Sequence, residues 1–347
     1  MFAMNKTVAV TGGTGYIAGF IIAEFLNHGY EVRASVRDLA KVDAVKKGLS
    51  GWVEDGACDR LTAFEADLTS PAGWGRGFDG VDGVIHVASP LGNGTESADE
   101  LIQVAQGGTL HVLQGAVDGG VKRVVMTSSG AACTPRVGVG EIVLDENFWS
   151  DTHNHELDPY RLSKIASERA AWAFAKDKAV QLTTILPGAV FGPIMRPDVI
   201  SGDEILLRLL NGGMPASVKV PLEVSDVRDV AALHRLAFEN DAAIGQRFLA
   251  SSTTITMPQV AKLYREHFPV AKAPKAVFPN WMVRLLAVFI PSLRQLVPML
   301  GRQYRHTTQK AETLLGWTHH TPQETVLDAA QSLIDHGLVT SISPRRV

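Results

Sequence analysis

The chain has 347 residues, enough to bury a large core in one large domain or in one domain with an added lobe. Its 33 basic and 36 acidic residues give a net charge of -3 and are interspersed, which excludes the basic footprint of a nucleic-acid-binding protein and favours a small, nearly neutral ligand. The two cysteines, Cys58 and Cys133, are too few for a disulfide framework, and the N-terminus leaves no room for a secretory signal, so we expect a cytoplasmic protein.

Short β-rich runs alternate with helical patterns through the first half of the chain. The expected strands are 7–11, 31–36, 61–65, 84–87, 121–127 and 181–186, and the expected helices are 16–27, 39–47, 98–118 and 160–176. This alternation predicts βαβ units, and hence an α/β fold with a doubly wound parallel sheet of the Rossmann type.

After Pro187 the alternation ends, and glycines and prolines interrupt the chain. We expect residues 1–190 to form the sheet domain, with a return strand and helix at about 222–250. Residues 191–221 and 256–347 are expected to form a smaller, mainly helical lobe over the carboxyl edge of the sheet, where ligands bind in this fold.

The stretch 281–300 is strongly apolar, but Arg284, Pro291, Arg294 and Pro298 interrupt it well short of the about 20 clean residues that a spanning helix needs. We therefore expect a packed or lid-like helix and no membrane partner, with a role at a membrane surface as the alternative for this stretch.

A glycine-rich turn follows the first expected strand. Gly12, Gly15 and Ala18 occupy a G-x-x-G-x-x-[GA] pattern, in which the backbone can approach a pyrophosphate at the N-terminus of the next helix. The position at the chain start, directly after a strand, predicts dinucleotide binding.

The end of the second strand discriminates between the two nicotinamide cofactors. NAD-binding proteins place an acidic residue there for the ribose hydroxyl, whereas this chain has Val36 followed by Arg37, whose guanidinium suits a 2'-phosphate. NADP(H) is therefore expected, although Asp38 could pair with Arg37 and weaken the preference. Asp67, at the end of the third strand, could accept from the adenine amino group or cap a helix.

Tyr160 and Lys164 lie one helical turn apart, so both side chains can face one ligand. Reduction of a carbonyl needs a group that protonates or polarises the oxygen, and the phenol of Tyr160 can do this, with the ammonium of Lys164 favouring phenolate and holding the ribose. Ser129, after the fifth strand, could orient the carbonyl, while the hydroxyls of Thr127 and Ser128 are expected to satisfy backbone groups.

Two histidine pairs, His153 with His155 and His319 with His320, raise the question of a metal. Neither pair has the i, i+4 helical spacing of zinc-binding histidines, and no carboxylate cluster accompanies them in sequence, so no metal is expected.

Together these motifs resemble the extended short-chain dehydrogenase/reductases, and within them the dihydroflavonol 4-reductase-like group that also holds microbial aldehyde and ketone reductases. The resemblance covers about the first 195 residues and includes the runs 32–38, 86–90, 127–129, 160–164 and 186–193. It implies that Ser129, Tyr160 and Lys164 are the catalytic residues. It implies cofactor contacts from Gly12, Gly15, Tyr16, Ile17, Arg37, Asp67, Leu68, Ala88, Tyr160, Lys164, Pro187 and Val190.

The resemblance implies an NADPH-dependent, reversible reduction of a ketone or aldehyde by an enzyme with a small-molecule substrate. Thr134 and the run around Tyr160 depart from the plant flavonoid and cinnamoyl-CoA reductases, so neither plant substrate is assumed. A hydroxysteroid-type dehydrogenase and a sugar-nucleotide epimerase or dehydratase remain alternatives, as does a non-catalytic NADP-binding sensor. Relatives dimerise through the helices at 98–118 and 160–176. These two helices therefore either form the interface of a homodimer or are covered by other parts of the same chain.

Overall fold

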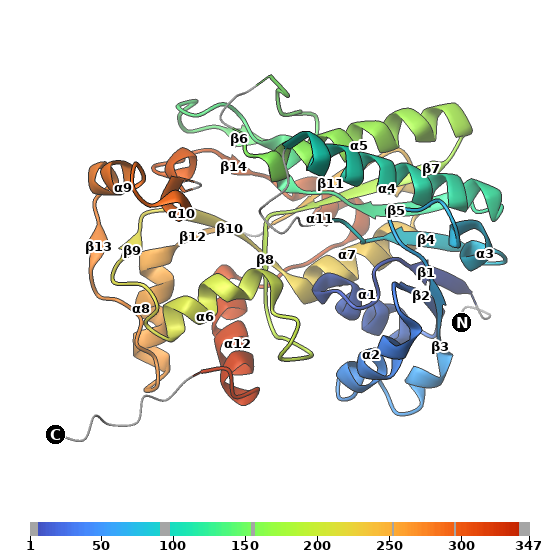
Figure 1. The fold of residues 1–347 in the computed structure, drawn as a ribbon, viewed down its shortest axis with the longest axis horizontal. Coiled ribbons are helices and arrows are strands. Elements are labelled where there is room, and N and C mark those ends of the chain that lie inside the picture. Colours follow the sequence, from blue (N-terminus) through green and yellow to red (C-terminus); the bar gives the residue numbers. More distant parts are fainter. Residues whose placement is uncertain (1–5, 91–97, 154–156, 252, 295, 340–347) are drawn as a thin grey trace.

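A seven-stranded parallel sheet forms the centre of the molecule (Figure 1). The structure is a computed structural model that describes residues 6–90, 98–153, 157–251, 253–294 and 296–339. In spatial order the strands are β3 (Leu61–Glu65), β2 (Glu31–Val36), β1 (Thr7–Val10), β4 (Gly83–His86), β5 (Arg123–Thr127), β7 (Gln181–Pro187) and β11 (Arg247–Ala250). The strand order reverses between β1 and β4, so the predicted doubly wound sheet is confirmed.

Helices cover both faces of this sheet (Figure 1). One face carries α1 (Tyr16–Asn27), α2 (Val42–Leu49) and α7 (Val227–Glu239), and the other carries α3 (Trp74–Phe78), α4 (Ala98–Asp118) and α5 (Pro159–Lys178). Strands β4, β5 and β11 are buried along their whole length, as expected when both faces are covered. Asp158 caps α5 and Pro159 occupies its first turn, which fixes where this helix begins.

The return segment differs from its expected form. Its strand, β10 (Pro221–Asp226), does not join the main sheet but pairs with β8 (Ala189–Phe191) and β12 (Thr254–Thr256). The strand that does return is β11, which pairs with β7. The short helix α3 was also not expected, because five residues with two glycines show no helical period.

The remaining elements lie over the carboxyl edge of the sheet or beside it. They are α6 (Glu204–Leu210), α8 (Met257–His267), α9 (Asn280–Leu286), α10 (Pro291–Arg294), α11 (Gln309–Leu315), α12 (Pro322–Asp335) and the strand pairs β9 (Ser217–Val218) with β13 (Val277–Phe278) and β6 (Val143–Leu144) with β14 (Arg305–His306). The division into two domains stays a prediction.

The apolar stretch 281–300 forms two short helices rather than one packed helix. Val283 is buried, but Trp281 and Phe289 are exposed, so the packed alternative is wrong for one face of this segment, while the lid-like alternative stays a prediction. None of the helices in the described parts of the chain is long and apolar enough to cross a membrane.

Candidate active site

A cleft of about 1790 Å³ opens at the carboxyl ends of the central strands, where the strand order reverses. It is bounded by the turn before α1, by the ends of β2, β3, β4 and β5, and by the first turns of α5. Every residue predicted to bind the cofactor or to act in catalysis lines this cleft: Gly12, Gly15, Tyr16, Ile17, Arg37, Asp67, Leu68, Ala88, Ser129, Tyr160, Lys164, Pro187 and Val190.

The glycine turn fits a bound pyrophosphate. Gly12 has a φ of +72°, and a Cβ atom there would lie 3.1 Å from the backbone and side chain of Ala88. The N-cap of α1 is Gly15, which offers no side-chain cap, so the first amides of α1 are left for a ligand. The hydroxyl of Tyr16 already has a partner within the protein, because it donates to the Pro193 carbonyl at 3.1 Å.

The end of the cleft beside β2 and β3 has a cation, Arg37, and a carboxylate, Asp67, on its wall. Arg37 is exposed, and within the described residues it makes no ion pair, because Asp38 instead accepts from the Ala40 amide at 2.9 Å. The hydroxyl and the amide of Thr69 donate to Asp67 at 2.7 and 2.8 Å and lower the pKa of its carboxyl. Asp67 therefore caps its own turn and not a helix, because the N-cap of the next helix is Gly73, so the helix-cap reading is wrong. Asp67 also lines the cleft, and its contact with adenine stays a prediction.

Ser129 and Tyr160 are held by the starts of two helical segments. Ser129 is the N-cap of a 3-10 turn, and its Oγ accepts from the Ala131 amide at 3.2 Å. Its own proton is consequently free to be donated. Tyr160 lies in the first turn of α5 and is 37% exposed, which makes it accessible to a ligand.

Lys164 lies one turn further along α5 and is buried. Its Nζ is 5.4 Å from the centroid of the Tyr160 ring and donates to Ser89 Oγ at 2.8 Å. Ser89 follows β4 on the floor of the cleft, so the ammonium is directed toward the cofactor side of Tyr160.

Two neighbours of Ser129 have partners other than the expected backbone groups. Ser128 Oγ donates to the fully buried carboxylate of Glu168 at 2.7 Å, and Thr127 Oγ1 lies 2.8 Å from His234 Nε2. Since the other ring nitrogen of His234 donates to a backbone carbonyl, Nε2 accepts from Thr127, and burial lowers the pKa of His234 to about 4. The expectation of backbone partners is therefore wrong, and these hydroxyls anchor the end of β5 to buried side chains.

A second cavity of about 940 Å³ adjoins the cleft. Four residues line both cavities: Ser129, Tyr160, Pro187 and Gly188. The rest of its wall includes Glu223 of β10 and two residues from near the end of the chain, Arg302 and His306.

The geometry around His306 requires a charged imidazole. Its Nε2 lies 2.8 Å from the Cys133 carbonyl and its Nδ1 lies 3.0 Å from both carboxylate oxygens of Glu223. Both partners can only accept, so both ring nitrogens must donate. Burial opposes this charge, but the hydrogen bonds with Cys133 and Glu223 outweigh it and raise the pKa of His306 to about 10. Arg302 donates to Glu223 at 3.1 Å as well.

This charged wall was not predicted from sequence. Glu223, Arg302 and His306 come from segments about 80 residues apart that the fold brings together. No local motif surrounds them, so only the tertiary contact reveals them. Ser89 was included only in the run 86–90, and its bond to Lys164 was not foreseen.

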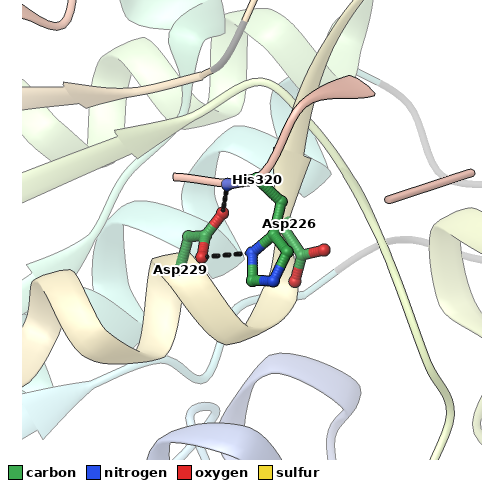
Figure 2. Close-up of side chains that lie close together, drawn as sticks. All are labelled: Asp226, Asp229 and His320. Carbon is green, nitrogen blue, oxygen red and sulfur yellow. Dashed lines mark hydrogen bonds and ion pairs between the residues drawn. The ribbon is translucent and has the colours of Figure 1, made fainter. Parts of the chain in front are cut away.

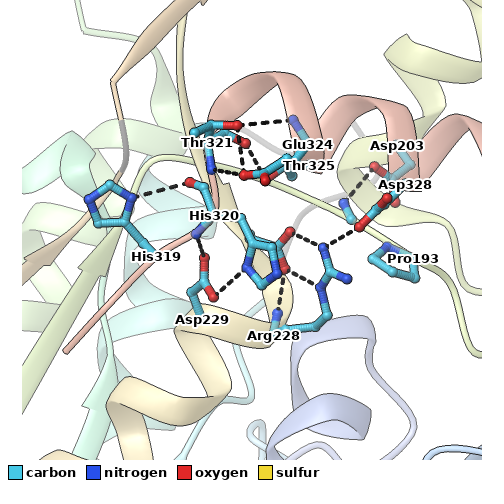
Figure 3. Close-up of polar contacts among 12 residues, drawn as sticks. Pro193, Asp203, Arg228, Asp229, His319, His320, Thr321, Glu324, Thr325 and Asp328 are labelled. Carbon is cyan, nitrogen blue, oxygen red and sulfur yellow. Dashed lines mark hydrogen bonds and ion pairs between the residues drawn. The ribbon is translucent and has the colours of Figure 1, made fainter. Parts of the chain in front are cut away.

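A cluster of Asp226, Asp229 and His320 places its possible ligand atoms within 4.8 Å of one another (Figure 2). Asp229 accepts from the His320 amide and from His320 Nδ1, both at 2.7 Å. Arg228 binds both oxygens of Asp226. Figure 3 shows its further contact with Asp328 of α12. The carboxylates are thus engaged by a cation and by hydrogen-bond donors, and the cluster ties α7 to the start of α12. His155, of the other histidine pair, lies outside the described residues.

Known proteins match this chain over most of its length. The profile of a family described as the NAD dependent epimerase/dehydratase family matches residues 8–251. Cinnamoyl-CoA reductase 1 of Arabidopsis thaliana is 31% identical over 341 residues, covering 96% of this chain and 96% of that protein. Tetraketide alpha-pyrone reductase 1 of the same plant is 30% identical over 343 residues, covering 97% and 98%. The structure of Gre2 from Candida albicans in complex with NADPH is 28% identical, with a TM-score of 0.76 and coverage of 95% and 99%.

Proposed function

The chain belongs to the NAD dependent epimerase/dehydratase family, the extended short-chain dehydrogenase/reductases, and on that premise we propose that it reduces a ketone or aldehyde to an alcohol with NADPH. The family predicted from the motifs is confirmed, and with it the class of oxidoreductase that acts on carbonyl groups with NADP(H) as cofactor. The residues that perform the reaction and the identity of the substrate are the proposed part.

One observation carries the proposal. Ser129 and Tyr160 lie on the boundary between the cofactor cleft and the second cavity, and they line both. A nicotinamide ring in the cleft and a carbonyl in the second cavity would therefore meet beside a hydroxyl and a phenol. Lys164 lines the cleft and is absent from the wall of the second cavity, as expected of a residue that serves the cofactor side.

The hydroxyl of Ser129 orients the substrate. Because its Oγ already accepts from the Ala131 amide, the hydroxyl proton can be donated to a carbonyl oxygen. A donor in this place polarises the carbonyl and stabilises negative charge as it develops on the oxygen.

Tyr160 supplies the proton that completes the alcohol, and in the reverse direction it accepts that proton. Its place in the first turn of α5 puts the positive end of the helix near the phenol, which favours the negative oxygen left after proton transfer. Lys164 adds a full positive charge on the cofactor side and holds the ribose hydroxyls in the same position.

The chain's own residues fit NADP(H). Bound in the cleft, the reduced nicotinamide supplies the hydride that reaches the carbonyl carbon. The turn at Gly12 and the open N-terminus of α1 hold the pyrophosphate, and Arg37 binds the 2'-phosphate that distinguishes NADP from NAD.

The relatives support carbonyl reduction but leave the substrate open. Those compared are named as a cinnamoyl-CoA reductase and a tetraketide alpha-pyrone reductase. The second cavity here has a charged wall of Glu223, Arg302 and His306, so its polar side can receive a substrate with hydrogen-bonding groups beyond the reacting carbonyl.

The test is oxidation of NADPH and of NADH by the purified protein against a panel of aliphatic, aryl and bulky ketones and aldehydes. We expect consumption that depends on the carbonyl compound and favours NADPH. Binding of NADPH without consumption for any member of the panel would contradict a general carbonyl reductase.

A further inference from the structure

The corner formed by α9 and α10 exposes an unusual amount of apolar surface. Phe289, Trp281, Val288 and Leu285 are 76%, 64%, 60% and 56% exposed, the four largest values among the large apolar side chains in the described parts of the chain. Figure 1 shows α9 and α10 at the outer end of the molecule, on the far side from β3. We call these four residues the α9 patch.

Helix α9 is apolar on both of its sides. Val283 and Ala287 are buried against the lobe, while Trp281 and Leu285, one turn apart, are exposed together, and Val288 in the turn after the helix is exposed as well. Large apolar side chains that gather on an exposed surface mark an interaction site, so this exposed side of α9 lacks the cover that its composition calls for.

The charge of the surrounding segment indicates what could cover it. From His267 to Ala311 the chain has seven lysines and arginines and no aspartate or glutamate. The whole chain has 33 basic and 36 acidic residues, so the rest of the chain, outside this segment, has 26 basic and all 36 acidic residues. Arg284 of α9 and Arg294 of α10 are exposed, and Arg294 lies beside the patch because it donates to the carbonyls of Ala287 and Val288. Lys275, which precedes β13, is exposed as well.

We infer that the α9 patch docks on the surface of an anionic phospholipid bilayer. Aromatic and aliphatic side chains would enter the headgroup region, and the basic residues around them would meet lipid phosphates and carboxylates. The inference runs against the expectation of no membrane partner made from the sequence, because the fold exposes side chains that were expected to be packed.

A second copy of the chain fits the patch less well. A twofold dimer sets the same surface against itself, so the basic residues around the patch would approach those of the other copy, and the segment 267–311 supplies no carboxylate to pair with them. An anionic bilayer gives the opposite charge at the same place.

Docking here would bring the lipid close to the substrate route. Arg284 of α9 also lines a cavity of about 870 Å³ that shares Arg161, Met299 and Arg302 with the second cavity. If the proposed function holds, apolar carbonyl compounds dissolved in the bilayer would reach Tyr160 through this cavity and the second cavity.

Co-sedimentation with vesicles tests the inference on the full chain. Vesicles of phosphatidylcholine with about 30% phosphatidylserine are compared with vesicles of phosphatidylcholine alone. We expect binding to the anionic vesicles that weakens as salt is added. The double variant Trp281→Ser/Phe289→Ser should bind the anionic vesicles at least about tenfold more weakly than the parent, because it removes the two most exposed apolar side chains.

Two further variants complete the test. Leu314→Ser removes an apolar side chain that is 40% exposed on α11, outside the basic segment, and should bind as the parent does. Lys275→Glu/Arg284→Glu should bind poorly with the apolar patch intact. Absence of binding to anionic vesicles, equal binding to both kinds of vesicle, or a dimer that Trp281→Ser/Phe289→Ser dissociates would overturn the inference. NADPH oxidation with a water-soluble ketone should be unchanged in Trp281→Ser/Phe289→Ser. This measurement therefore distinguishes a failure of membrane docking from a failure of the proposed function.

Discussion

Replacing His306 with glutamine tests whether the wall of the second cavity carries a buried positive charge. The side chain of His306 is 4% exposed, and both of its ring nitrogens donate to groups that only accept. Glutamine can donate one of these hydrogen bonds but cannot carry the charge. The variant should therefore lose the stability that the charge contributes, and the size of this loss depends on pH. Any other effect of the substitution on stability should be the same at every pH.

The magnitude follows from proton linkage. The pKa of His306 rises from 6.5 to about 10 on folding, so the folded state holds the proton more tightly. Its contribution is complete below pH 6.5 and is lost as the pH rises toward 10. The shift corresponds to roughly 4 kcal/mol at pH 7 and roughly 1 kcal/mol at pH 9. The difference in unfolding free energy between the parent and His306→Gln should therefore shrink by roughly 2 to 3 kcal/mol between these pH values.

Urea denaturation at pH 7, 8 and 9 measures this difference. His336→Gln is the matched control, since His336 is exposed at the end of α12, and its effect should be small and independent of pH. A cost of His306→Gln that stays constant from pH 7 to 9 would show that His306 is neutral and refute the reasoning.

Three further substitutions separate the parts of the site. Arg37→Ser should lower kcat/KM for NADPH by about 10- to 100-fold, the loss of a charged hydrogen bond to phosphate, and leave NADH unaffected; an equal loss with both cofactors would contradict the assignment. Gly12→Ala should weaken NADPH binding measured by calorimetry and cost about 1–2 kcal/mol of stability, because of its positive φ and the approach of Ala88; unaltered binding would contradict the close approach of the turn. Arg247→Met should lower the unfolding free energy by about 3–5 kcal/mol in urea, since it leaves the buried Glu168 carboxylate without its cation, and Glu168→Gln in the same background should restore part of the loss.

The sheet and the cofactor side of the site follow from local sequence signals. The bounds of α1 and α4 and of strands β2 and β3 were predicted to the residue, because each lies in a clear periodic run between turn residues. Gly12, Ser129 and Tyr160 were predicted for a related reason. Each sits at the junction of a strand or turn with a helix, and such junctions have short-range motifs.

The substrate side could not be predicted in this way. His306 meets Glu223 through contacts between residues 83 positions apart, and nothing near either residue marks the pair. The strand β10 was expected in the main sheet. Its sequence predicts a strand, but it does not indicate which other strand it pairs with. The same limit applies to α9, whose apolar sequence predicts burial equally well for both of its sides.

The central claim is that Tyr160 supplies the proton at the boundary of the two cavities. The most direct measurement is NADPH oxidation by Tyr160→Phe with a carbonyl substrate of the parent, together with NADPH affinity measured by calorimetry. The account predicts a loss of turnover of about 100-fold or more with affinity unchanged within a few-fold, since the ring remains and only the hydroxyl is removed. Turnover equal to that of the parent, with NADPH bound, would contradict it.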